Sequence, residues 1–207
     1  MDPNEFPTKG NLILAKNTLR MSRQGYDLLD KKRNVLIKEI MALDDRAKEI
    51  QTYIDSAFRE AYEALQVVNI DMGVNDVERF SYAVAREESV SIKYRSIMGV
   101  EIPVLNYDKS SNETPSYGLG NTTSALDDAY AKFNAVKDWI IKLSMVENAA
   151  YRLAVAIRKT QKRANALKNV TIPRYENLAK TIQETLDERE RDEFTRLKVI
   201  KKGKERG

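Results

Sequence analysis

The chain has 207 residues, of which 42% are apolar and 32% are charged, so it can form an ordered core beneath a largely solvated surface. Its 35 basic and 31 acidic residues leave a net charge of +4, a mixed balance that by itself argues only weakly for nucleic-acid binding. It contains no cysteine and no histidine, which excludes disulfides, thiol nucleophiles, Ser-His-Asp triads and the usual zinc sites.

Residues 12 to 68 carry apolar side chains at alternating steps of three and four, which is the spacing of a coiled-coil helix. Fifteen of the seventeen positions in this series are apolar, and only Ser22 and Arg33 interrupt it. No proline falls in the stripe, so we expect one long helix that faces one partner helix, with Thr8 as its N-cap. The predicted seam residues of this helix include Leu29, Leu36, Ile40, Leu43, Ile50 and Ile54.

The middle of the chain changes from helical to strand spacing. Residues 75–86 are ambiguous between a short helix and irregular structure, and then apolar and polar residues alternate through 90–95 and again through 100–104. This pattern predicts a β-hairpin that turns at Gly99. Pro103 cannot donate to a strand ladder, so the second strand should be an edge strand.

A second long apolar stripe begins near residues 124–126 and continues to Thr171. Beyond that point the spacing becomes Tyr175, Leu178, Ile182 and Leu186, which includes four-residue steps that favour unwinding of a coiled coil. Pro173 lies in the same region, so we expect a kink or a break near residues 169–173. A basic tail follows from Arg196 and should fray. The stripe passes through Phe133, Val136 and Ile140, and its predicted seam residues include Leu143, Leu153, Ile157 and Leu167.

This order predicts a mainly α fold, in which the N- and C-terminal helices form a long antiparallel two-helix coiled coil with a small insert containing a β-hairpin. We expect residues 1–68 to form the first coiled-coil helix, residues 69–125 the insert, and residues 126–207 the second helix with its basic tail, together one elongated unit. Each helix alone would leave its apolar stripe in water.

No segment has the spacing of a catalytic or cofactor site. The one Gly-x-Gly sequence, at Gly118, lacks a third glycine and a buried strand before it, and no phosphate-binding loop of the GxxxxGK[ST] type occurs. The acidic pairs Asp44-Asp45 and Glu87-Glu88 are adjacent, so on a helix their members would not share a face. We therefore predict no cofactor, no metal site and, because no apolar run approaches about 18 residues, no membrane-spanning helix.

Basic residues gather toward both ends of the chain. Seven cations and no acid lie between Asn148 and Tyr175, and four cations and no acid lie between Lys9 and Tyr26. In an antiparallel hairpin these segments share the end that carries the termini, where they form either a solvated face or a contact with an acidic or phosphate-bearing partner. The candidate contact residues are Lys9, Arg20, Arg23, Arg158, Lys159, Lys162 and Arg163.

Three segments resemble the D subunit of V-type and archaeal-type (A-type) ATP synthases. They are PTKGNLILAKNTLRMSRQGYDLL from Pro7, NETPSYG from Asn112, and KRANALKNVTIPRYENLAKTIQ from Lys162, and the resemblance continues to Lys198. The match follows the whole chain in order. The pairing of the first segment with the third is fairly specific, because generic coiled coils do not share it.

The resemblance implies a central rotor stalk, a non-catalytic component of a rotary proton- or sodium-translocating complex. The terminal end would enter the hexamer of catalytic A and B subunits, and the insert end would face the small F subunit of the stalk and the C subunit, the adaptor on the membrane ring. It implies a cytoplasmic, membrane-peripheral location without direct nucleotide or nucleic acid. From the residues alone, a prefoldin-like coiled-coil chaperone and a basic nucleic-acid-binding coiled coil stay open as alternatives.

Overall fold

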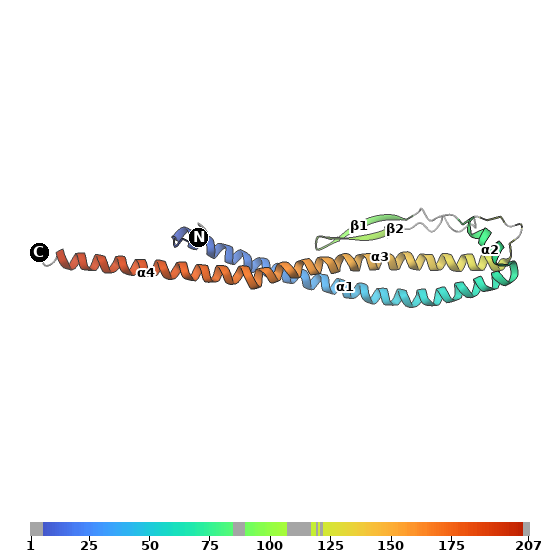
Figure 1. Cartoon of the computed structure of the whole chain (residues 1–207), viewed down its shortest axis with the longest axis horizontal. Helices are drawn as coiled ribbons and strands as arrows, with labels where there is room; N and C mark the ends of the chain where they lie inside the picture. The colour runs from blue at the N-terminus through green and yellow to red at the C-terminus, as the bar shows by residue number, and fades with distance from the viewer. Residues whose placement is uncertain (1–5, 85–89, 107–116, 119, 121, 205–207) are drawn as a thin grey trace. The chain divides into compact units, whose positions relative to one another are not determined.

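The computed structural model describes residues 6–84, 90–106, 117–118, 120 and 122–204. The elements in chain order are α1 (Lys9–Met72), α2 (Val74–Ser81), β1 (Ser91–Ile97), β2 (Val100–Asn106), α3 (Ser124–Ala166), the π-helix η4 (Leu167–Thr171) and α4 (Ile172–Lys204) (Figure 1). This confirms the predicted fold class of two long helical segments with a β-hairpin insert between them. The acidic pair Glu87-Glu88 and residues 112–116 of the NETPSYG motif lie outside the described residues.

The chain forms two compact units, and both long helical segments contribute to each. The terminal unit comprises Met1–Asn34 and Arg158–Gly207, and the insert unit comprises Val35–Ile157. This spatial grouping differs from the division into residues 1–68, 69–125 and 126–207, which follows the order of the chain. Across the described residues, no helix is long and apolar enough to cross a bilayer.

The first helix begins and ends where local chemistry favours it. The N–H of Asn11 donates to Thr8 Oγ1 at 3.2 Å, so Thr8 caps the first turn as predicted. Gly73, with φ of 85°, follows the last residue of α1 and separates it from α2. A side chain at that φ would be strained, which is why glycine suits the break.

The predicted seam lies on the packed side of the helices. All seventeen positions of the α1 stripe are buried or half-buried, and Leu36 is 0% exposed. Of the seam residues in the second stripe, Leu153 is also 0% exposed, whereas Leu143, Ile157 and Leu167 are half-buried. The predicted stripe is wrong at Ile140, which is 44% exposed because the neighbouring Trp139 packs there instead, stacked on Tyr53 of α1 at 5.2 Å between ring centroids.

The β-hairpin packs onto the helix pair of the insert unit (Figure 1). Ile102 of β2 joins Leu36 of α1 and Leu153 of α3 in one buried cluster, which also includes Ala149. Two further contacts hold the same strand, β2, against α3. Arg152 Nη1 donates to the Glu101 carbonyl at 3.3 Å, and the N–H of Leu105 lies 3.4 Å from Met145 Sδ.

The hairpin turns at Met98 and Gly99, which have φ of 50° and 74°, between the paired residues Ile97 and Val100. Two positive φ values in a two-residue loop match the right-handed twist of the strands. In this register Tyr94 pairs with Pro103, so even-numbered residues of one strand face odd-numbered residues of the other. The two predicted apolar rows therefore lie on opposite faces. The row of β2 is packed, whereas Ile92 and Tyr94 of β1 are each 57% exposed.

A second apolar cluster lies where α1 ends and α3 begins. It contains Val68 of α1 and Leu126 of α3, with Ala64, Ala129 and Tyr117. The ring of Tyr117 contacts Phe80 of α2 edge-on, at 5.9 Å between centroids. Its hydroxyl donates to Asp127 Oδ1 at 2.7 Å. Burial of the ring and this hydrogen bond raise the pKa of Tyr117 well above its ordinary value.

The helix does not break at Pro173. Ala166 and Ile172, which flank η4, both have right-handed helical dihedral angles, so the backbone passes from α3 through η4 into α4 without leaving the helical region. Of the predicted kink or break near residues 169–173, the break is therefore wrong, and a π-turn lies there instead. The basic tail from Arg196 is helical through Lys204 rather than frayed.

We expect Leu36→Ala to lower the free energy of unfolding by about 2–5 kcal/mol, because it leaves a cavity among α1, α3 and the hairpin. Thermal or urea unfolding followed by circular dichroism measures this. Met41→Ala on the same helix is the matched control, because Met41 is 62% exposed and its loss should change stability little. Equal effects of the two substitutions would contradict the proposed packing.

We expect Tyr117→Phe to destabilise the chain by about 1–2 kcal/mol at pH 7 through loss of the hydrogen bond to Asp127. A raised pKa in the folded state means that the folded chain holds the phenol proton more tightly, so this stabilisation is complete below about pH 10 and is lost as the pH rises further. The stability difference between wild type and variant should therefore shrink above pH 10. Tyr151→Phe, at a 71% exposed position, is the matched control and should change stability little at pH 7.

Candidate partner-binding surface

Polar side chains hold the two helices of the terminal unit in an antiparallel arrangement. Going along α1, Lys9 pairs with Glu190 at 3.1 Å, and Arg23 pairs with Glu176 at 2.6 Å. Between them Lys16 Nζ donates to Gln183 Oε1 at 3.0 Å. The partners on both helices are spaced by seven residues, which is the heptad repeat of a coiled coil. These contacts are exposed, so each contributes only about 0–1 kcal/mol.

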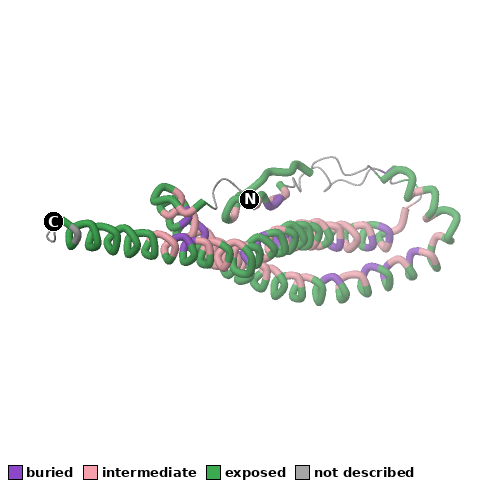
Figure 2. The backbone as a smooth tube through the Cα atoms, turned by 60° about the vertical axis from the view of Figure 1, so that its left-hand side comes forward, coloured by how far each residue is buried: buried purple, intermediate pink, exposed green. Residues whose placement is uncertain are grey.

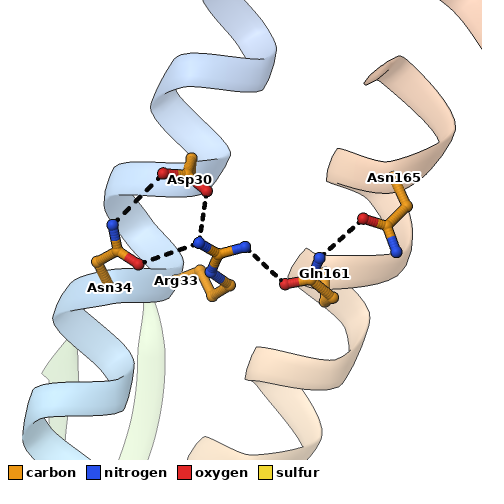
Figure 3. Close-up of polar contacts among 5 residues, drawn as sticks. All are labelled: Asp30, Arg33, Asn34, Gln161 and Asn165. Atoms are coloured by element: carbon orange, nitrogen blue, oxygen red, sulfur yellow. Dashed lines mark hydrogen bonds and ion pairs between the residues drawn. The ribbon is translucent and has the colours of Figure 1, made fainter. Parts of the chain in front are cut away.

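A polar layer lies at Arg33, one of the two positions that interrupt the apolar stripe of α1 (Figure 3). Its guanidinium contacts Asp30 at 2.6 Å and donates to Gln161 Oε1 at 2.8 Å. Gln161 in turn donates to Asn165 Oδ1 at 2.8 Å. The Arg33 side chain is only 26% exposed, and a half-buried polar group of this kind stabilises the register in which its partners meet it.

The other interruption, Ser22, is 8% exposed and lies in a seam of small residues. Ala15 and Ala164 are each 1% exposed, and Thr160 is 6% exposed. Small side chains at these positions allow the two helices of the terminal unit to approach closely. The larger Ile182, at 1% exposed, fills the seam on α4.

Four cations of α3 face solvent on the side of the helix away from this seam: Arg158, Lys159, Lys162 and Arg163. Arg158 and Lys162 are neighbours on the helix surface because they are four residues apart, as are Lys159 and Arg163, and the two pairs together cover the side opposite the seam. Within the described part of the chain, none of these four side chains forms a hydrogen bond or an ion pair. Lys168 lies next along the chain, with its Nζ 5.9 Å from the ring of Tyr26. The four residues are called the cationic face below.

The seven candidate contact residues therefore fall into two groups. Lys9 and Arg23 already have acidic partners on α4, and Arg20 Nη2 donates to Asn17 Oδ1 at 3.5 Å. Lys9 and Arg23 contribute to the antiparallel pairing of the terminal unit, whereas the hydrogen bond of Arg20 lies within α1. Of the seven candidate residues, the four of the cationic face are therefore the ones whose charges are available to bind another molecule.

An apolar surface at the end of α4 is absent from the sequence-based prediction. From Asp187 to Lys202 every residue is exposed (Figure 2). Phe194, Leu197 and Ile200 in this stretch are 65%, 65% and 58% exposed, and lysines and arginines lie between them. Their three-residue spacing in the sequence indicates a helix with an apolar row, although the charge of the stretch predicts a fraying basic tail.

The insert unit contains a cavity of about 360 Å³ beneath α2. Aromatic and aliphatic side chains line most of it, among them Leu65, Val77, Phe80, Tyr130 and Phe133. Lys137 is its charged lining residue, so no pair of acid and base groups meets there. Elsewhere in the described ranges, no cluster of acidic side chains could hold a metal ion.

Comparison with known proteins identifies relatives along nearly the whole chain. A family model for the D subunit of ATP synthase matches residues 11–202. The V-type ATP synthase D subunit of Thermotoga neapolitana is 42% identical over 195 residues, which are 94% of this chain and 96% of that protein. The A-type ATP synthase D subunit of Methanobrevibacter smithii is 39% identical over 197 residues, 94% of this chain and 85% of that protein. The corresponding protein of Pyrococcus abyssi is 34% identical, again over 94% of this chain.

Proposed function

The chain belongs to the family of ATP synthase D subunits, and on that basis we propose that it is the central rotor stalk of a V/A-type ATP synthase or ATPase. In this role it transmits torque between the catalytic head and the ion-translocating ring in the membrane. The observation that carries the proposal is the family match over residues 11–202 to a chain whose two long helical segments pair antiparallel.

The packing of the helices suits the transmission of torque. A single α-helix bends and twists easily, whereas two helices joined by a continuous seam deform together. In the terminal unit the seam is reinforced by contacts one heptad apart and by the polar layer at Arg33. In the insert unit the stacked rings of Tyr53 and Trp139 bridge α1 and α3. Such cross-links oppose sliding of one helix along the other.

The terminal unit is the part we assign to the catalytic A and B subunits. The cationic face offers four positive charges without a partner of its own among the described residues. A surface of this kind suits acidic groups that line a surrounding ring, since the attraction acts over about 8–10 Å and does not demand one fixed orientation. The exposed apolar side chains Phe194, Leu197 and Ile200 of α4 suit an apolar collar in the same head.

The insert unit is the part we assign to the small F subunit of the stalk and to the C subunit that serves as adaptor on the membrane ring. It carries most of the exposed aromatic and aliphatic side chains that lie outside α4, including Tyr53, Tyr62 and Ile70 at 58%, 54% and 83% exposed. Exposed apolar side chains in this number favour protein partners over solvent.

The chain is one component of an ATP synthase complex, and we infer that it contributes no catalytic group. Phosphate-binding loops and paired acid and base groups were not found in its sequence or in its described cavity. ATP chemistry then belongs to the partner subunits. The chain itself would be a cytoplasmic, peripheral part of the complex.

The two alternatives have less support. A prefoldin-like chaperone and a basic coiled-coil nucleic-acid-binding protein share the coiled coil, but neither accounts for a family match that spans the insert and both helices. Binding to single-stranded nucleic acid would also need exposed aromatic side chains among the cations. The cationic face has Tyr151 nearby and no aromatic residue within it.

Reversing two charges of the cationic face tests the contact with the head. We expect Lys162→Glu with Arg163→Glu to loosen assembly or to let ATP turn over with less ion transport. Both side chains point away from the seam, so thermal unfolding of the free chain should change by less than a few degrees. The measurement is ATP-driven ion pumping beside ATP hydrolysis in the rebuilt complex, at low and at high salt.

The charge-conserving pair Lys162→Arg with Arg163→Lys is the matched control and should retain pumping. The defect of the reversed pair should shrink at high salt, because screening weakens exposed charges. Normal assembly, hydrolysis and pumping of the reversed pair at low salt would leave the cationic face as a solvated surface.

The isolated chain should neither bind nor hydrolyse ATP, because its sequence contains no phosphate-binding loop of the GxxxxGK[ST] type. Titration calorimetry with Mg-ATP on the purified chain is the measurement. Binding in the micromolar range would reveal a nucleotide site that the described residues do not suggest.

A further inference from the structure

The apolar row of the second helical segment changes phase at η4. Up to this turn the row follows coiled-coil steps, through Thr160, Ala164, Leu167 and Thr171. The same steps continued would bring residues 174, 178, 181 and 185 to the inside, but 174 and 181 are exposed and 178 and 185 are only half-buried. The buried residues beyond the turn are instead Ala179 and Ile182, with Tyr175 half-buried, one residue later than the heptad predicts.

The hydrogen bonds of η4 explain why the buried positions shift by one residue. The N–H of Ile172 donates to the Leu167 carbonyl, five residues back instead of four. The Thr171 hydroxyl donates to the Ala166 carbonyl at 3.5 Å, again across five residues. A π-turn holds one more residue than an α-turn, so the helix downstream is rotated back into phase. Pro173 has no N–H and would clash with the carbonyl four residues before it in an α-helix, which makes this place the least costly one for a wider turn.

The packing around η4 is light. None of its five residues is buried, and Val170 is 64% exposed. On the opposite helix the turn meets Gly25. A Cβ placed on Gly25 would lie 3.6 Å from Leu167 Cδ1, so α1 offers Leu167 backbone rather than a side chain at this point, while the neighbouring Tyr26 ring lies 5.9 Å from Lys168 Nζ.

We propose that η4 is a one-residue insertion that keeps the apolar row of α4 facing α1, and that it is the torsional joint of the terminal unit. Twist between α3 and α4 is taken up at this turn, where π-type hydrogen bonds replace α-type ones and where α1 presents a glycine. The seam on both sides of the joint stays packed while the turn itself adjusts.

Deleting Val170 tests the insertion. The deletion is made together with Pro173→Ala, because an unbroken α-helix would otherwise carry the proline clash, and it is compared with Pro173→Ala alone. We expect the deletion variant to unfold at the same temperature as its reference or higher, with a regular α-helix through the region. Hydrogen exchange of the backbone amides of residues 166–175 should become at least tenfold slower, because the joint is gone.

Two controls use the same Pro173→Ala background. Inserting one alanine after Val170 adds a second extra residue, and deleting the exposed Lys159 shifts the apolar row where no π-turn precedes it. Both should lower the unfolding temperature by several degrees. If deletion of Val170 destabilises the chain as much as these controls do, the proposal that η4 contains a one-residue insertion is wrong. If the Val170 deletion variant keeps its stability but its amide exchange is unchanged, the proposal that η4 is a torsional joint is wrong.

A second readout rests on the proposed rotor function. The chain has no cysteine, so two cysteines introduced on exposed residues of the insert unit can hold a bead on the complex. With the Val170 deletion, the angular fluctuations of the bead during a catalytic pause should narrow relative to Pro173→Ala. Normal pumping with an unchanged width would overturn the joint and leave the proposed function intact. ATP-driven pumping by a complex rebuilt without this chain would instead count against the proposed function.

Discussion

The structure depends on one constraint, which is that each long helix carries an apolar stripe too narrow for a globular core and too long to leave in water. Only another helix with a matching stripe can cover it, and burial of that seam dominates the favourable free energy of folding. The β-hairpin packs onto this seam at Leu36 and Leu153, which are both 0% exposed. The rest of the chain is arranged so that the seam is not interrupted.

Heptad spacing in the sequence was sufficient to predict the two helices, because a period of three and four residues is a local property that tertiary contacts here reinforce. The hairpin and its turn at Gly99 were predictable for the same reason. The π-turn was not, since a step change in the apolar row near Pro173 fits a kink, a break or an inserted residue equally well. Which of them forms depends on the partner helix, where Gly25 leaves room.

The positive charge of the candidate surface could be predicted from the sequence, but the residues that form the surface could not. A run of cations without acids indicates positive charge at one end of the chain, yet it does not say which cations find partners on the neighbouring helix. Lys9 and Arg23 do so because Glu190 and Glu176 lie at the matching heptad positions of α4. The pairing of helices thus removes some charges from the surface and leaves those of α3, which point away from the seam.

The odd-with-even pairing in the β-hairpin has a consequence for how related chains can vary in length. A turn of Met98 and Gly99 fixes which face of β1 accompanies the packed row of β2. One residue gained or lost at the turn would exchange the faces of β1, bringing Ile92 and Tyr94 to the side of Ile102 and removing Lys93 and Arg95 from it. Homologues that conserve the docked strand should therefore differ here by even numbers of residues or carry a compensating bulge.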